Sequence, residues 1–456
     1  MTPAPLGLLF SFYGDDFTGS TDTMESLAVA GLRTVLFLHP PDPADLTTRF
    51  AGLQAVGVAG VSRAMPPEWM DDALPPLFER LRRLDAPIVN YKICSTFDSS
   101  PRVGSIGRAI EIGRRAFPAP FVPLLVGAPT LRRYCLFGNL FASVGDATYR
   151  LDRHPTMSRH PITPMNEGDL RLHLAAQTTL PVGLLDILAL TGTADQVQAR
   201  LDTVLTSGAA IMLFDVLDEQ RLAAAGRVIW QACSTMAPRG PLFVAGSSGV
   251  GYALTAYWRT IGLLGAPPEF AAAGPAEPLL VLSGSCSPTT ATQIRWALDN
   301  GFAGARLAAP DPRDPQRAHD APQATLDWVR TRLAAGRNTV VYTALGPDDP
   351  AIGDDTGVGD ALGWLAHATL QEPGVRRLVV AGGDTSGLVV RHLGIEALEM
   401  IMPLAPGGPL CRAHARERWL DGLQIALKGG QVGQADYFGR AARGDPLPMS
   451  ASPQHA

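Results

Sequence analysis

The sequence is poor in cysteine and shows no cysteine pattern. Its five cysteines, Cys94, Cys135, Cys233, Cys286 and Cys411, are odd in number and include no Cys-x-x-Cys spacing. Disulfide-stabilised secreted domains carry paired cysteines, which this chain lacks. The cysteines are therefore expected to be the reduced thiols of a cytoplasmic protein.

The sequence also lacks long apolar runs and an excess of either charge. No apolar stretch approaches the roughly 20 residues that a membrane-spanning helix needs, and no basic segment precedes the first apolar run, so no signal peptide is apparent. Charged residues make up 18% of the chain, and the net charge is −5. Neither nucleic acid nor an anionic membrane is therefore expected as a partner.

The length and the hydrophobic pattern indicate two domains of the α/β class. The 456 residues exceed the roughly 250 to 300 at which a single core stops growing. Apolar runs of strand length alternate with longer segments of helical period, which is typical of a mostly parallel sheet with helices on both faces. The predicted strands are Leu6–Phe12, Thr34–Leu38, Gln54–Ala59, Pro87–Tyr91, Phe121–Gly127, Gly183–Ile187, Ala210–Phe214, Leu242–Ala245, Leu279–Leu282, Thr339–Thr343, Arg377–Ala381 and Leu398–Met402.

Two segments interrupt this rhythm. Residues 265–277 are rich in glycine, proline and alanine and are predicted to link an N-terminal domain, residues 1–264, to a C-terminal domain, residues 278–443. Residues 444–456 are predicted to be a frayed tail. The segment Arg132–Met165 has little periodicity, and it is either one wall of a substrate site or a solvated surface flap.

The most informative motif is an acidic loop after the first predicted strand. Asp15 and Asp16 lie between two glycines, and a helix is predicted to begin at about Thr21. In a parallel α/β unit such a loop lies where ligands bind. Adjacent carboxylates can raise one another's pKa, which suits a general base, although one of them could instead orient Mg²⁺ or only cap the helix. Asp22 is placed behind them.

Two cations are expected at the same edge of the sheet. Arg63 follows one predicted strand closely, and Lys92 ends another. Fixed cations suit a ligand that carries a carboxylate, although either residue alone would more often be a surface charge.

The second domain has two glycine-rich turns that each follow a predicted strand. They are Ser283–Ser287 and Gly382–Gly387. Backbone amides and helix N-termini in such turns bind phosphate. Neither turn is a Walker A loop, because no Lys-Ser/Thr closes the glycine run. A single glycine-rich turn of this kind more often only shapes the chain, but two in one domain favour a nucleotide-binding site.

Taken in order, these motifs resemble the four-carbon acid sugar kinase family from the acidic loop almost to the C-terminus. The motifs are Asp15–Gly19, Tyr91–Thr96, Gly284–Ser287 with Thr290 and Gln293, Gly382–Gly387, Ala405–Gly407 and Leu427–Gly430. The resemblance implies phosphorylation of a small sugar acid by ATP, with an N-terminal domain for the acid, a C-terminal domain for the nucleotide and the active site in the cleft between them.

The resemblance also assigns residues to each ligand. Catalysis falls to Asp15 and Asp16. The acid is assigned to Asp15, Arg63, Lys92, Cys94, Ser95 and Thr96. ATP is assigned to Ser285, Gly382, Gly383, Asp384, Thr385, Ser386, Gly387 and Gly430. Mg²⁺ is expected, and Asp384 is one residue that would act through it. Lys428 is placed near the phosphates. The metal ligands are left open, and so is assembly as a homodimer.

The chain departs from the usual family pattern in the acid-binding segment. Cys94 stands where an aspartate is common, and Phe97–Ser100 replaces a Leu-Arg-Gly sequence. The loss of a carboxylate and of an arginine guanidinium changes which substrate groups the site can bind. We therefore expect a substrate outside the threonate and erythronate set, such as the branched keto acid 3-oxo-isoapionate.

Three other functions compete with this interpretation. A dehydrogenase of small hydroxy acids that uses NAD would need a G-x-G-x-x-G fingerprint, and the turn Gly246–Gly251 has the wrong spacing. A phosphatase that uses Asp15 as nucleophile would need an Asp-x-Asp pair. A sugar-acid sensor with an inactive nucleotide domain differs from a kinase only in turnover.

Overall fold

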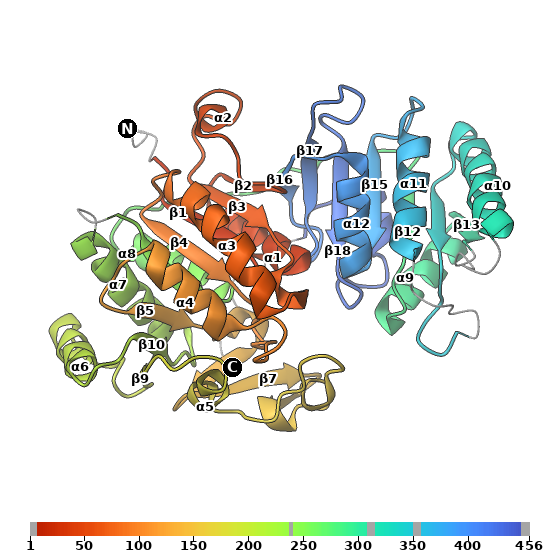
Figure 1. The fold of residues 1–456 in the computed structure, drawn as a ribbon. Coiled ribbons are helices and arrows are strands. Elements are labelled where there is room, and N and C mark those ends of the chain that lie inside the picture. The colour runs from red at the N-terminus through yellow and green to blue at the C-terminus, as the bar shows by residue number, and fades with distance from the viewer. Residues whose placement is uncertain (1–6, 237–239, 308–314, 350–356, 448–456) are drawn as a thin grey trace. The chain divides into compact units, whose positions relative to one another are not determined.

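The structure is a computed structural model that describes residues 7–236, 240–307, 315–349 and 357–447. The chain divides into two compact units, Met1–Pro268 and Glu269–Ala456 (Figure 1). This division falls inside the predicted linker 265–277. The predicted strand start at Leu6 and residues 448–456 of the predicted tail lie outside the described residues.

The first unit is built on eight parallel strands, in the order β2-β3-β1-β4-β11-β5-β10-β9. Buried parallel strands form nearly continuous apolar runs, which is why the sequence pattern found them. The strands are β1 (Phe10–Gly14), β2 (Thr34–Phe37), β3 (Ala55–Ala59), β4 (Ile88–Lys92), β5 (Val122–Leu125), β9 (Val182–Leu185), β10 (Ile211–Phe214) and β11 (Leu242–Gly246).

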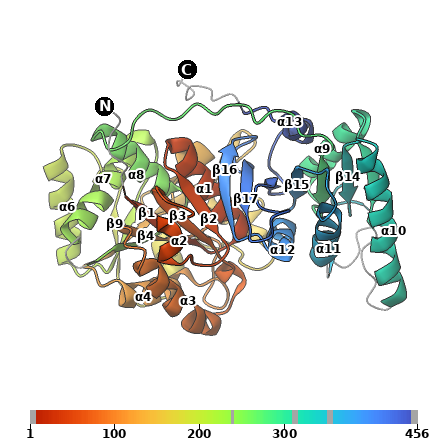
Figure 2. The ribbon, with the colours of Figure 1, turned by 90° about the horizontal axis from the view of Figure 1, so that it is seen from above.

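Helices cover both faces of this sheet. Helices α1, α7 and α8 pack together on one face, and α3 and α4 pack together on the other (Figure 2). The helices of this unit are α1 (Phe17–Ala30), α2 (Pro43–Thr47), α3 (Pro67–Arg82), α4 (Ile106–Ala116), α5 (Leu170–Ala175), α6 (Ala194–Thr206), α7 (Glu219–Met236) and α8 (Gly249–Thr260). The α/β class is therefore confirmed.

The first helix begins earlier than the sequence analysis predicted. Asp16 is its N-cap, and the side-chain Oδ1 accepts the backbone N–H of Gly19 at 3.0 Å. The helix therefore starts at Phe17 rather than at about Thr21, and Asp22 lies on its second turn. The Asp16 carboxylate therefore caps this helix, which is one of the roles that the sequence analysis considered for the acidic loop.

The segment after β5 forms a small antiparallel sheet. Its strands are β6 (Arg133–Leu136), β7 (Asn139–Val144) and β8 (Ala147–Arg150). Phe137 and Gly138 make the β6–β7 turn, with φ of 50° and 81°. Both N–H groups of this turn donate to the buried carboxylate of Asp215, which also accepts the N–H of Ile187 at 3.1 Å. Part of the aperiodic segment is thus regular structure fastened to the main sheet.

The second unit has a mixed sheet in the order β13-β14-β12-β15-β18-β17-β16. The pairs from β13 to β18 are parallel, and β16, β17 and β18 pair antiparallel. The strands are β12 (Leu280–Ser283), β13 (Ala303–Arg306), β14 (Thr339–Tyr342), β15 (Arg377–Ala381), β16 (Ala397–Met402), β17 (Leu410–His414) and β18 (Gln424–Lys428). The sequence analysis did not predict β13, β17 or β18.

The helices of the second unit also lie on both faces of its sheet. Helices α10, α11 and α12 pack on one face, and α9 and α13 on the other (Figure 2). They are α9 (Pro288–Asp299), α10 (Pro315–Ala334), α11 (Val358–Leu370), α12 (Gly383–Leu393) and α13 (Tyr437–Arg443). None of the helices in the described parts of the chain combines the length and the apolar character needed to cross a membrane.

The chain before β12 is held by the end of the second unit. The N–H of Ala273 donates to Gly444 O, and that of Ala276 donates to Ala442 O, both at 3.0 Å. Arg377, which is 1% exposed, donates to the carbonyl oxygens of Gly274, Ala441 and Ala442. The segment from Ala273 on is thus structured as part of this unit.

Candidate active site

The acidic loop lies where the first sheet changes the direction in which strands are added. From β1 the chain forms β2 and then β3, which lies between β2 and β1, on one side and places β4 on the other. The loops that leave β1 and β4 therefore diverge at their carboxyl ends, which is the place where ligands bind in open α/β sheets. The register pairs Gly14 with Ala59 and with Lys92, so the three loops that follow share one edge.

Asp15 and Arg63 form a buried ion pair at this edge. Arg63 Nε lies 3.2 Å from Asp15 Oδ2, and Nη2 lies 2.6 Å from Oδ1. The backbone repeats the contact, because Arg63 N–H donates to Asp15 O at 2.9 Å. Burial raises the pKa of Asp15, and the guanidinium opposes that rise. Both carboxylate oxygens of Asp15 are occupied by Arg63, so this residue is placed to hold the loop.

Asp16 is placed differently. Its Oδ1 accepts the Gly19 N–H and lies 2.6 Å from Arg63 Nη2. Its Oδ2 has no hydrogen-bond partner among the described residues, and the side chain is 26% exposed. Asp16 therefore offers a free carboxylate oxygen to a ligand.

Lys92, unlike Arg63, is not paired with a carboxylate among the described residues. It ends β4, is 2% exposed, and its Nζ makes no hydrogen bond or ion pair with the described residues. A Cβ built on Gly19 would lie 2.7 Å from Lys92 Nζ and 2.4 Å from Asp16 Oδ1, so the ammonium reaches the start of α1. An ammonium group without a protein partner on an otherwise buried side chain favours an anionic or oxygen-rich ligand.

Asp22 lies near the same charges. Burial raises its pKa, and the positive charge of Lys92 opposes the rise. Lys92 therefore acts on both Asp15 and Asp22.

The segment after β4 forms a short hydrogen-bonded chain. Cys94 Sγ lies 2.8 Å from Thr96 Oγ1, and that hydroxyl donates to Asp98 Oδ1 at 2.8 Å. Burial raises the pKa of the Cys94 thiol to about 11, so the side chain is neutral. Ser95 is half-buried beside them. The structure thus brings Asp15, Asp16, Arg63 and Lys92 together, with the segment of Cys94, Ser95 and Thr96 following directly.

The glycine-rich turns of the second unit gather in the same way at the edge of its own sheet. Ser283 pairs with Ala381, and Ala381 pairs with Lys428, so three loops leave neighbouring strands at one level. The chain adds β13 and β14 on one side of β12 and β15 on the other, which opens a crevice between the loops after β12 and β15.

Close approach of these loops requires the glycines. A Cβ on Gly284 would lie 2.3 Å from Thr385 Oγ1, and one on Gly430 would lie 2.7 Å from Ser285 Oγ. Gly382 has φ of 121°, which favours glycine. Ser285, Thr385 and Gly430 therefore line one small area.

The remaining residues of the second turn differ in exposure. Gly383, Asp384, Thr385 and Gly387 lie in the first turns of α12, with Asp384 exposed. Ser386 is 2% exposed, and its hydroxyl donates to Gly382 O at 2.7 Å. Ser386 thus shapes the turn.

Lys428 is buried behind these loops. It is 1% exposed, and its Nζ donates to Thr290 Oγ1 at 2.9 Å, while Thr290 donates to Gly430 O at 2.8 Å. Burial lowers the pKa of Lys428 to about 7. The sequence analysis gave Thr290 no role, although its position one turn into α9 after a glycine-rich loop was a usable signal.

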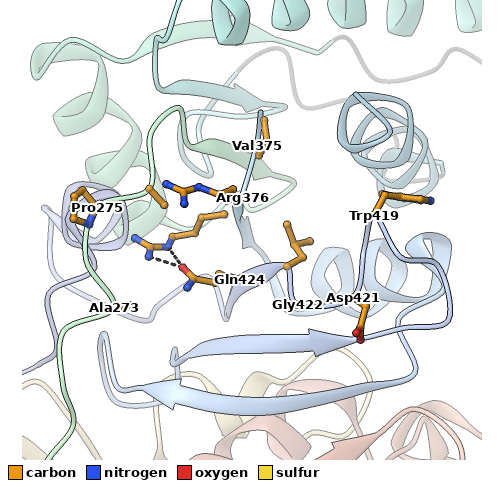
Figure 3. A pocket seen from close by; sticks show the side chains of 11 residues that line it. Ala273, Pro275, Val375, Arg376, Trp419, Asp421, Gly422 and Gln424 are labelled. Atoms are coloured by element: carbon orange, nitrogen blue, oxygen red, sulfur yellow. Dashed lines mark hydrogen bonds between the residues drawn. The ribbon is translucent and has the colours of Figure 1, made fainter. Parts of the chain in front are cut away.

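A distinct cavity lies at the opposite edge of the second sheet. It measures about 280 Å³ and is lined by residues that include Arg376, Trp419 and Gln424 (Figure 3). Arg377 and Gln424 begin β15 and β18, whereas the glycine-rich turns follow the ends of their strands. The cavity is therefore separate from the predicted nucleotide site.

No group of three or more His, Cys, Asp or Glu side chains suitable for a metal ion occurs among the described residues. Mg²⁺ in phosphoryl-transfer sites is commonly bound by one or two carboxylates together with substrate phosphates. The exposed Asp384, at the N-terminal turn of α12, fits that arrangement.

Two family models match the chain. A sugar-binding N-terminal domain matches residues 10–254, and a nucleotide-binding C-terminal domain matches residues 280–438. The acidic loop lies in the first match, and the glycine-rich turns lie in the second.

Similar proteins cover nearly the whole chain. The 3-oxo-isoapionate kinase of Paraburkholderia graminis is 48% identical over 97% of this chain and 96% of its own length. The 3-oxo-tetronate kinase of Methylobacterium radiotolerans is 33% identical over 96% of this chain and 99% of its own. A crystal structure from Salmonella typhimurium shares the fold, with a TM-score of 0.80, 24% identity, and coverage of 97% of this chain and 100% of that one.

Proposed function

The chain belongs to the four-carbon acid sugar kinase family and is a kinase of small sugar acids, and we propose that it transfers the γ-phosphoryl group of ATP to a hydroxyl of a branched or oxidised sugar acid such as 3-oxo-isoapionate. The predicted family and activity are confirmed by the two domain matches and the two kinase relatives. The choice of acid follows the 48% identical relative.

Asp16 is the general base of this proposal. Phosphoryl transfer to an alcohol needs a carboxylate that orients the hydroxyl and accepts its proton. Asp16 keeps one oxygen free and is partly exposed, whereas Arg63 occupies both oxygens of Asp15. Asp15 therefore fixes Arg63 and the loop, and Asp16 receives the proton as the hydroxyl oxygen attacks phosphorus.

Lys92 holds oxygens at the reacting end. Its unpartnered ammonium lies beside the start of α1, where the N–H groups of the first helical turn add positive potential. A keto or hydroxyl oxygen next to the attacking hydroxyl would satisfy this charge. The same charge would stabilise the negative oxygens of the phosphoryl group in transfer.

The C-terminal domain binds ATP through its glycine-rich turns. Amides at the starts of α9 and α12 face the crevice between β12 and β15, and Ser285, Thr385 and Gly430 converge there. Mg²⁺ when bound would neutralise phosphate charge. Asp384 is the carboxylate offered to it.

Transfer requires the γ-phosphate to meet the hydroxyl held at Asp16. An active site in the cleft between the two domains, which closes over both substrates, is therefore part of the proposal, since water would otherwise compete as the acceptor.

One observation carries the proposal: the carboxylate of Asp16, whose second oxygen has no partner among the described residues, and the ammonium of Lys92, which makes no hydrogen bond with them, both lie beside Gly19 at the start of α1. The test is Asp16→Asn, which keeps an oxygen able to cap α1 but removes the base. We expect kcat to fall by about two to four orders of magnitude with ATP binding retained. Asp42→Asn is the matched control, because Asp42 also caps a helix through its side chain, at the start of α2.

ADP release would be measured with a panel of four- and five-carbon sugar acids and their keto forms. Full activity in Asp16→Asn would contradict the role of the acidic loop. ATP and acid binding without turnover in the unaltered protein would favour a sugar-acid sensor instead.

A further inference from the structure

A second arginine reaches the edge of the sheet that carries the acidic loop. Arg133 begins β6, and its backbone pairs in both directions with Ala128, three residues after β5 ends (N to O distances of 3.1 and 2.9 Å). Strand β5 is separated from β4 only by β11. The guanidinium of Arg133 therefore comes from a neighbouring loop at this edge, where it interacts electrostatically with Cys94 and Asp98.

The hydrogen bonds of Arg133 leave one side of its guanidinium open. Its Nη1 donates to the carbonyl oxygens of Leu131 at 3.0 Å and Arg132 at 3.2 Å, which anchors the group. Its Nε is buried without a partner, and Nη2 has none among the described residues. The Nε and Nη2 side is the one with which Arg63 grips both oxygens of Asp15. A planar carboxylate fits this edge in two parallel hydrogen bonds.

The neighbours of Arg133 do not neutralise it. Its charge acts on Cys94 and Asp98, but no ion pair forms with either within the described chain. The Cys94 thiol is neutral, and the Asp98 carboxylate already accepts the Thr96 hydroxyl. A carboxylate at position 94 would compete for the guanidinium, whereas the thiol leaves it available.

A second donor without a partner lies nearby. His154 is 5% exposed, and its Nδ1 accepts the backbone N–H groups of Thr156 and Met157, both at 3.2 Å. Burial, helped by the charge of Arg133, lowers its pKa, so the ring is neutral and carries its proton on Nε2. That Nε2 is buried and has no partner. Two unpaired N–H donors in one region indicate a missing acceptor.

We propose that Arg133, with His154 beside it, binds the carboxylate of the sugar acid and so selects acids whose carboxylate lies at the far end from the phosphorylated hydroxyl. This assignment rests on the proposed function, in which Asp16 and Lys92 hold the reacting end. Arg133 then limits the length and the branching of the sugar acids that the site accepts, because its guanidinium and Asp16 fix the two ends of the substrate.

The test uses Arg133→Gln and Arg133→Lys, with Arg132→Gln as the matched control, since Arg132 is the exposed neighbour whose side chain donates to Gly145 O at 2.6 Å. Arg133→Gln should raise KM for the acid by about ten- to a hundredfold, the loss expected for hydrogen bonds to a charged group. Arg133→Lys keeps the charge but not the fork and should fall between. KM for ATP should stay unchanged in all three.

A substrate analogue separates recognition from a structural role. The best acid is compared with its primary amide, which lacks the negative charge. Arg133→Gln should weaken binding of the acid far more than binding of the amide. Equal effects on both ligands, or an unchanged KM for the acid, would overturn the proposal. If Arg133→Gln does not fold, the same comparison with Arg133→Lys decides.

Calorimetric binding of the acid, measured with a non-hydrolysable ATP analogue present, keeps this test independent of turnover. Failure of the unaltered protein to phosphorylate any acid would count against the proposed function. Equal acid affinity of the unaltered protein and Arg133→Gln would count against the role of Arg133.

Discussion

The buried Lys428 behind the glycine-rich turns is expected to make ATP binding depend on a proton. Lys428 has one hydrogen bond, to Thr290, and no acidic partner among the described residues. Its pKa of about 7 means that the free protein holds it largely uncharged above that pH. Phosphate oxygens bound near Gly430 would favour the ammonium form, so ATP should bind together with a proton.

The size of the effect follows from the pKa. At pH 8, one unit above a pKa of about 7, about one Lys428 in ten is charged, and at pH 9 about one in a hundred. If ATP needs the charged form, KM for ATP rises up to about tenfold between pH 8 and 9, or about 1.4 kcal/mol. ATP itself does not titrate there, because the second pKa of a phosphate is near 6.

The assay is titration calorimetry with ATP in buffers of different ionisation enthalpy. At pH 8 the unaltered protein should take up about 0.9 proton for each ATP bound, the fraction that is uncharged one unit above the pKa. Lys428→Met should abolish this uptake. Lys428→Arg should abolish it too, because arginine remains charged, and its KM for ATP should not vary between pH 8 and 9.

The pH dependence of the free energy of unfolding checks the direction of the Lys428 pKa shift. Between pH 7 and about 10.5 the unfolded chain holds the Lys428 proton and the folded chain does not, so the free energy of unfolding should rise with pH through this window. No proton uptake on ATP binding, together with the same pH dependence in the unaltered protein and in Lys428→Met, would refute the reasoning.

Three substitutions test other parts of the structure. Gly19→Ala should raise KM for the acid and lower kcat at nearly unchanged Tm, because its Cβ would lie 2.7 Å from the flexible end of Lys92; unchanged kinetics would separate this point from catalysis. Arg377→Met should lower the free energy of unfolding by about 3 kcal/mol, measured in denaturant, because buried carbonyl oxygens lose a charged donor; an unchanged midpoint would contradict that. Gly226→Ala should destabilise by about 2 kcal/mol, because its Cβ would lie 2.0 Å from Ala253 O, where α7 meets α8; a rise in Tm would show that the helices can separate.

The sequence predicted the parallel sheets well for a physical reason. Strands buried on both faces are mainly apolar, as in β1 and β15, which are buried at every position, so they stand out from the amphipathic helices between them. The carboxyl ends of such strands carry the loops, which is why the order of residues alone was enough to assign Asp15, Lys92 and the glycine-rich turns to two sheet edges.

The antiparallel strands were missed, except for β16, because their pattern is weak. All four residues of β8 are exposed, and β17 mixes buried and exposed positions without strict alternation. The start of α1 was misplaced, because nothing in the sequence shows which of the two adjacent carboxylates caps the helix; the structure gives this position to Asp16.

Contacts between side chains could not be predicted. The sequence assigned Arg63 to the acid, which stays a prediction, but it gave no sign that both Asp15 and Asp16 lie against the guanidinium. It flagged Arg132–Met165 as a possible wall without singling out Arg133, whose significance lies in the hydrogen bonds that it does not make.

The single carboxylate of Asp215 has a consequence for how such kinases diversify. It secures the β6–β7 hairpin through the N–H groups of Phe137 and Gly138, which any sequence able to form that turn supplies. A hairpin transplanted from a relative should therefore pack against the unaltered parallel sheet through the same contact with Asp215. New acid preferences could then arise by exchange of one short module, with the phosphoryl-transfer machinery left as it was.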